Sequence, residues 1–98
     1  MITFRQISCE SDCTGPYVVN ISKSMTVKNF IDELLEKYPY EWGYIGIYKN
    51  GTYFGEPHCE YKRGKLLYSL PNEYLNRQIK SVDGSGGWYR SDFILHIV

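Results

Sequence analysis

Four residues have the chemistry of metal ligands, namely Cys9, Cys13, His58 and Cys59. Zinc sites commonly combine one C-x2–4-C pair with a second pair of Cys or His residues at a similar spacing. Cys9 and Cys13 fit the first pair, but His58 and Cys59 are adjacent, and adjacent residues of a strand point to opposite faces of a sheet. The simpler interpretation is two exposed loop cysteines and one half-buried strand cysteine, with no metal or other cofactor.

A cysteine nucleophile would need a histidine as its base. His58 is the sequence neighbour of Cys59 and faces away from it, and His96 lies in an apolar segment, where an outward structural role is the simpler interpretation. The acidic residues of a predicted helix fall together on its polar side, which indicates a solvated face rather than an acid–base pair (Asp32, Glu33 and Glu36). We therefore expect no enzymatic activity.

Residues 83–87 read Asp-Gly-Ser-Gly-Gly, a composition that could suggest a phosphate-binding loop. Such a loop lies between a strand and a helix, so that its amides converge on the anion. Here a strand-like segment follows, and there is no Gly-Lys-Ser/Thr. The glycines predict a flexible connector.

The composition predicts one cytoplasmic domain, residues 1–98. Lysine plus arginine equals aspartate plus glutamate at 11 each, which argues against duplex DNA or an anionic membrane as a partner. No apolar run approaches the ~20 residues of a membrane helix, and we expect no signal peptide, since no apolar run follows the first residues. The 10 tyrosines and the absence of alanine favour strands and contact surfaces. Stacking of these rings on single-stranded nucleic acid is an alternative, but it lacks surplus positive charge, so proteins are the predicted partners.

One amphipathic helix is predicted over residues 27–38. Its apolar residues recur at helical spacing on one stripe (Val27, Phe30, Ile31, Leu34, Leu35 and Tyr38). Thr26 precedes the stripe as the N-cap, and Pro39 ends the helix. Alternating or apolar segments predict strands around it. Residues 1–8 and 17–22 form one hairpin, and a strand at 43–48 turns at 50–51 and returns over 52–54. Residues 58–61 and 66–70 form a second hairpin, a short helix follows at 71–79, and residues 93–98 form a central strand.

Two segments resemble ubiquitin-like proteins of the β-grasp fold. Residues 21–30 resemble the step from the second strand into a threonine-capped helix, and residues 94–98 resemble the last strand, in which apolar residues alternate around an outward histidine. The resemblance covers residues 1–54 and 88–98. It implies an α+β fold, a β-grasp mixed sheet with one main helix packed across it, to which residues 55–87 add a hairpin and a short helix. It also implies that the final strand lies between the first strand and the strand at 43–48.

The resemblance also bears on function. Ubiquitin and the related sulfur carriers present a flexible tail that ends in Gly-Gly. Here the last residue, Val98, belongs to a strand-like segment, and Gly86-Gly87 is internal. The resemblance therefore implies an interaction role rather than conjugation or sulfur transfer.

Strand alternation places four side chains together on the sheet face away from the helix, namely Tyr44, Tyr48, Ile94 and His96. Large apolar groups there need a cover, which is either residues 55–87 of the same chain or another molecule. We expect a non-enzymatic ubiquitin-like module that binds a protein partner, or a second copy of itself, through this face. The alternative is a small metal- or ligand-binding domain that uses Cys9, Cys13, His58 and Cys59.

Overall fold

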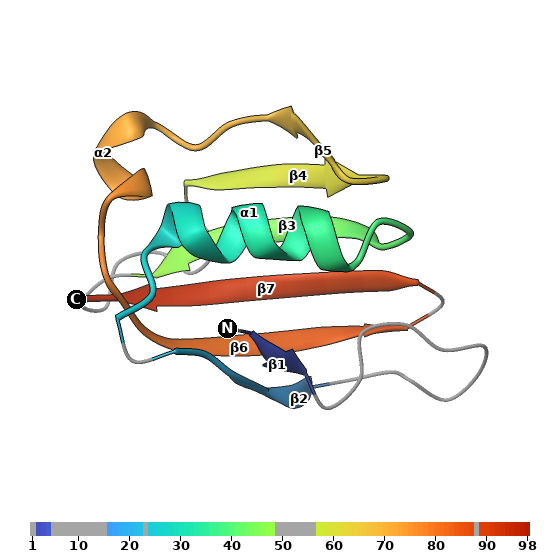
Figure 1. Cartoon of the computed structure of the whole chain (residues 1–98), viewed down its shortest axis with the longest axis horizontal. Helices are drawn as coiled ribbons and strands as arrows, with labels where there is room; N and C mark the ends of the chain where they lie inside the picture. Colours follow the sequence, from blue (N-terminus) through green and yellow to red (C-terminus); the bar gives the residue numbers. More distant parts are fainter. Residues whose placement is uncertain (1, 5–15, 23, 49–56, 88) are drawn as a thin grey trace.

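A computed structural model describes residues 2–4, 16–22, 24–48, 57–87 and 89–98. These residues form one α+β unit, with helix α1 lying across one face of a mixed sheet (Figure 1). The elements follow the chain in the order β1 (Thr3–Phe4), β2 (Pro16–Asn20), α1 (Val27–Lys37), β3 (Trp42–Tyr48), β4 (His58–Lys62), β5 (Lys65–Tyr68), α2 (Asn72–Leu75), β6 (Ile79–Gly87) and β7 (Arg90–Ile97). No helix in these ranges is long and apolar enough to cross a bilayer.

The described strands form a sheet in the order β1-β2-β6-β7-β3-β4-β5. Strand β7 is central, as its apolar sequence predicts, and it runs parallel to β3. Its other neighbour is β6, which runs antiparallel to it. The prediction that the first strand takes this place was wrong, because β6 separates β7 from the hairpin of β1 and β2.

The glycines of β6 explain why this segment was mistaken for a connector. Gly84, Gly86 and Gly87 all pair with residues of β7. A Cβ on Gly86 would lie 1.9 Å from the carbonyl oxygen of Arg90, so a larger residue does not fit there. Glycine in a strand often marks such a close approach of two backbones. Here Gly86 allows β6 to stay paired with β7 up to the turn that joins the two strands.

Helix α1 begins and ends where the sequence predicts, to within a residue. The hydroxyl of Thr26 accepts a hydrogen bond from the Asn29 backbone N–H at 3.2 Å, and the Asn29 side chain accepts one from the Thr26 N–H at 3.3 Å. This reciprocal pair satisfies two amides that the first turn leaves without helical partners. The helix ends at Lys37, two residues before Pro39.

The core lies between α1 and the sheet. The helix contributes four residues of its predicted apolar stripe, and β3 and β7 contribute alternate residues, all of them buried (Val27, Phe30, Ile31, Leu34, Ile45, Ile47, Phe93, Leu95 and Ile97). The other two residues of the stripe, Leu35 and Tyr38, are partly buried against this core. The Phe30 and Phe93 rings meet edge to face at 5.3 Å between centroids. Tyr61 of β4 is also fully buried, and its hydroxyl donates to the Ser91 carbonyl at 2.6 Å, which satisfies the one polar atom of this ring.

Residues 57–87 extend the sheet and do not cover its face opposite α1. The predicted hairpin is confirmed as β4 and β5, joined through Arg63 and Gly64, whose φ values of 51° and 77° are both positive, as in a type I′ turn. Of the short helix predicted over 71–79, only the four residues of α2 are helical, and α2 lies close to α1. The sequence analysis offered this segment as a possible cover for the sheet face that lies away from α1. For residues 57–87 that alternative was wrong. The predicted turn at 50–51 and the return over 52–54 lie outside the described residues.

Candidate functional site

The side of the sheet opposite α1, called the open face below, carries every second side chain of β3, β4 and β7. The intervening residues, such as Ile45 and Phe93, are buried against the helix, so the pleat directs their neighbours outward. The outward residues of these strands, together with Tyr68 of β5, combine rings, charges and one aliphatic group (Trp42, Tyr44, Tyr48, His58, Glu60, Lys62, Tyr68, Arg90, Asp92, Ile94 and His96). A protein partner would therefore meet a surface that is both aromatic and polar.

The four residues predicted for a contact surface are adjacent on this face. The parallel register of β3 and β7 sets Tyr48 opposite His96 and Gly46 opposite Ile94. The Tyr48 and His96 rings meet edge to face, 5.2 Å apart. Tyr44, 39 % exposed, and Ile94 line a hollow of about 310 Å³ with Gly46 and His58. Gly46 has no side chain, so the hollow lies between the residues on either side of it.

A second row of rings extends the surface toward the edge of the sheet. His58 lies between two tyrosines, with its ring 5.6 Å from that of Tyr44 and 5.9 Å from that of Tyr68. The Tyr68 hydroxyl donates to Glu60 Oε1 at 3.3 Å. Desolvation raises the pKa of Tyr68, and the negative charge of Glu60 raises it further, so the phenol remains a hydrogen-bond donor.

Arg90 organises one end of the open face. Its guanidinium carbon lies 4.9 Å from the centre of the Trp42 ring and 5.4 Å from that of Tyr44, within cation–π range of both. Its Nε donates to Asp92 Oδ2 at 3.1 Å. Asp92 Oδ1 also accepts the Tyr44 backbone N–H at 2.9 Å, so one carboxylate holds both the arginine and the backbone of β3.

Gly43 makes that arrangement sterically feasible. Its φ is +154°, and a Cβ there would lie 2.1 Å from the Ser91 carbonyl oxygen and 2.7 Å from Asp92 Oδ1. Any side chain at position 43 would therefore displace the aspartate that orders Tyr44 and Arg90.

At the other end of the face, His96 faces a carboxylate. Its Nε2 lies 2.6 Å from Oδ2 of Asp83, on the neighbouring strand β6. The sequence analysis missed this partner because it interpreted residues 83–87 as a connector. It also missed Trp42, Tyr68 and Arg90, although Trp42 lies two residues before Tyr44 and Arg90 four residues before Ile94, the spacing of one strand face.

The candidate metal ligands do not converge. Cys59 is fully buried on the helix side of the sheet, and His58 is exposed on the open face. Desolvation raises the pKa of the Cys59 thiol to about 12, which keeps it protonated and unsuited to act as a nucleophile or ligand. Cys9 and Cys13 lie outside the described residues. Within the described ranges, no group of three or more His, Cys, Asp or Glu residues could hold a metal ion.

One of the predicted solvated carboxylates has a structural role instead. Glu33 Oε1 accepts the Ile2 backbone N–H at 2.7 Å and a hydrogen bond from Lys37 Nζ at 3.0 Å. Desolvation would raise the pKa of Glu33, but the hydrogen bond from Ile2 and the Lys37 charge outweigh it, and the pKa is lowered. Glu33 thus joins α1 to the residue before β1, whereas Asp32 forms only a surface pair with Lys28.

Comparisons with protein families, curated proteins and solved structures found no match to this chain.

Proposed function

We propose that the chain is a non-enzymatic, ubiquitin-like interaction module. Its open face binds a protein, either a partner of different sequence or a second copy of the chain. The observation that carries the proposal is an aromatic sheet face that no described element covers. Residues 57–87, the segment that could have buried it, lie within the sheet and beside α1 instead. Exposed apolar surface of this kind is typical of contact sites.

The composition of the face supports the proposal. Binding energy in protein interfaces is concentrated in Trp, Tyr and Arg residues, which this face provides as Trp42, Tyr44 and Arg90. The arginine is already ordered by two rings and by Asp92, so binding would fix few additional rotamers. The hollow above Gly46 offers a place for one side chain of the partner.

The ubiquitin-like relationship is part of the same proposal. The capped helix, the hairpin of β1 and β2 and the central last strand fit it. Strand β6, inserted between that hairpin and β7, departs from it and makes the chain at most a variant of the β-grasp. A cytoplasmic location also remains a proposal; the free thiol of Cys59 is compatible with a reducing compartment.

The test is a double substitution, Tyr44→Ser with Tyr48→Ser, compared with Tyr40→Ser. Tyr40 is 81 % exposed but lies outside the open face, so its loss removes a similar ring from elsewhere on the surface. Sedimentation velocity over a concentration series measures self-association, and quantitative pull-downs compare the proteins captured by the wild type and the two variants. We expect the double variant to lose dimerisation or one specific partner, while Tyr40→Ser retains it.

Thermal and urea unfolding of the same variants decides between an interface and a core. An interface role predicts that the double variant changes the free energy of unfolding by about 1 kcal/mol, as expected for surface substitutions. Unchanged association together with a loss of several kcal/mol would show that the tyrosines stabilise the fold, and it would exclude the open face as a binding site.

A further inference from the structure

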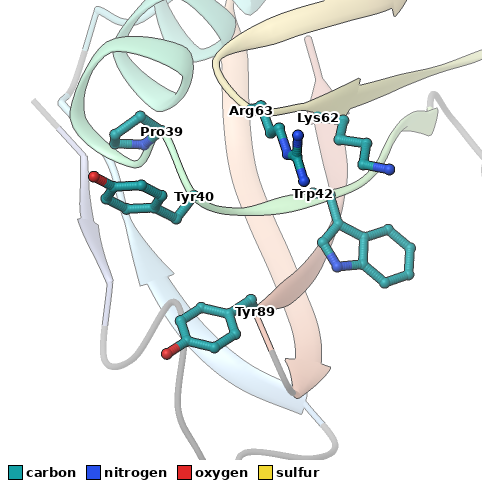
Figure 2. Close-up of a pocket in the computed structure, with 6 residues that line it drawn as sticks. All are labelled: Pro39, Tyr40, Trp42, Lys62, Arg63 and Tyr89. Carbon is teal, nitrogen blue, oxygen red and sulfur yellow. The ribbon is translucent and has the colours of Figure 1, made fainter.

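Three connections that are distant in the sequence converge at one end of the sheet. They are the segment between α1 and β3, the turn between β4 and β5, and the turn before β7. Together they line an open hollow of about 910 Å³ (Pro39, Tyr40, Trp42, Lys62, Arg63 and Tyr89). In Figure 2, Tyr40 and Tyr89 lie on one side of the hollow and Trp42 and Lys62 on the other, with Arg63 between them. We call this the terminal hollow.

Backbone hydrogen bonds hold the three connections together. The Trp42 N–H donates to the Tyr89 carbonyl at 3.1 Å, which joins the segment before β3 to the turn before β7. The Arg63 N–H donates to the Glu41 carbonyl at 3.3 Å, which joins the β4–β5 turn to the same segment. The lining side chains are therefore mounted on a connected frame, which favours a preformed site over a chance depression.

Backbone strain is concentrated in the same place. Among the described residues other than glycine, Arg63 and Tyr89 are the two with positive φ, at 51° and 66°. Both line the terminal hollow. The type I′ turn between β4 and β5 accounts for the φ of Arg63, whereas Tyr89 holds a large side chain in left-handed backbone, an unfavourable conformation that is often found at binding sites.

The terminal hollow combines exposed rings with positive charge. Tyr40, Tyr89 and Trp42 are 81 %, 42 % and 40 % exposed, so much of their ring surface is open to solvent. Lys62 and Arg63 line the hollow, and Lys65 lies opposite Lys62 in the hairpin.

Two carboxylates lie near these cations. Asp92 is paired with Arg90, and Glu41, between Tyr40 and Trp42 in the sequence, is buried, so Lys62 and Arg63 outnumber this one remaining carboxylate. The acidic residues of α1 line a different hollow, where Lys37 also lies, and Lys28 and Lys37 pair with Asp32 and Glu33.

We infer that the terminal hollow binds single-stranded nucleic acid. Open aromatic rings provide platforms on which bases stack, and the lysine and arginine side chains pair with the phosphates between them. An acidic peptide would satisfy the cations, but it would leave three exposed ring faces without planar groups to stack on. The terminal hollow shares Trp42 and Lys62 with the open face, but Tyr48, Ile94 and His96 do not line it, so a variant at Tyr48 tests one site without the other.

Fluorescence anisotropy of a labelled single-stranded oligothymidylate tests the inference, with a length of about ten nucleotides to match the span of one small domain. We expect saturable binding that weakens steeply as salt increases, because phosphate contacts release counterions. Tyr40→Leu should weaken binding by roughly 5- to 150-fold, the range for losing one base–aromatic stack. Arg63→Gln should weaken it and also reduce the salt dependence.

Two controls separate this site from general charge and from the open face. Lys28→Gln removes an exposed lysine of α1, and Tyr48→Ser alters the part of the open face that does not line the terminal hollow; both should bind as the wild type does. Melting temperatures of Tyr40→Leu and Arg63→Gln should match the wild type, since both positions are exposed.

Four results would overturn the inference. They are no binding at low salt, equal loss of affinity in Lys28→Gln and Arg63→Gln, equal affinity for duplex of the same length, and comparable affinity for a polyglutamate peptide. The last would indicate an acidic-peptide site.

Discussion

Replacing Gly43 by alanine should be one of the most damaging small changes in the chain. The new Cβ would lie 2.1 Å from the Ser91 carbonyl oxygen, whereas ordinary contact begins at 3.4 Å, so the two central strands would have to separate by about 1.3 Å (3.4 minus 2.1). The φ of +154° adds strain for any residue with a side chain, about 1–3 kcal/mol. Displacing the Asp92 carboxylate from the Tyr44 N–H removes a charged hydrogen bond worth about 1.5–3 kcal/mol.

The two contributions predict a loss of about 2.5–6 kcal/mol in the free energy of unfolding, a large part of the ~5–15 kcal/mol typical of a small domain. Urea unfolding followed by circular dichroism measures this loss. Gly64→Ala is the matched control: its φ is also positive, at +77°, but its nearest neighbour is the Leu35 carbonyl at 3.4 Å. It should therefore cost only about 1–2 kcal/mol, the strain of an L-residue in left-handed backbone. Equal costs for the two substitutions would refute the close contact of β3 with β7.

Three further predictions concern the core, the centre of the sheet and the N-terminal contact. Leu34→Ala should destabilise the fold by about 2–5 kcal/mol and Asp32→Ala by little, as measured in urea; equal losses would contradict the orientation of α1. Hydrogen exchange should be slowest at the amides of 93–97 and faster in α2, and the reverse order would show that β7 is not central. Because the pKa of Glu33 is lowered in the folded state, its stabilising effect is present above the unfolded pKa and is lost as pH falls through the folded one. Unfolding measured across this range should therefore show Glu33→Gln closest to the wild type at the acidic end, and a constant difference would exclude the linkage.

The sequence predicts local order well and long-range pairing poorly in this chain. Helix α1 follows from the spacing of its apolar stripe and from Thr26, both of which act within a few residues. The central position of β7 follows from a strand that is apolar on both faces. The partner of β7 does not follow, because the glycines of β6 indicate a loop unless their contact with Arg90 is known.

The same contrast between local and long-range information applies to the two candidate sites. Tyr44, Tyr48, Ile94 and His96 lie together on one face because alternation within two strands fixes their direction. The terminal hollow could not be predicted, since its residues come from 39–42, 62–63 and 89 and meet only when three connections converge. The net charge of the whole chain also gives no sign that Lys62 and Arg63 lie together beside three aromatic rings.

The parallel pairing of β3 with β7 has a consequence during synthesis. Trp42 pairs with Arg90, 48 positions later, so the centre of the sheet is completed by a late segment of the sequence. While the ribosome is still making β7, β3 and β6 each expose an edge with unpaired amides and carbonyls, which can pair with other chains. Closure of such long-range contacts is slow, so the nascent chain passes through a period in which its central strands need protection.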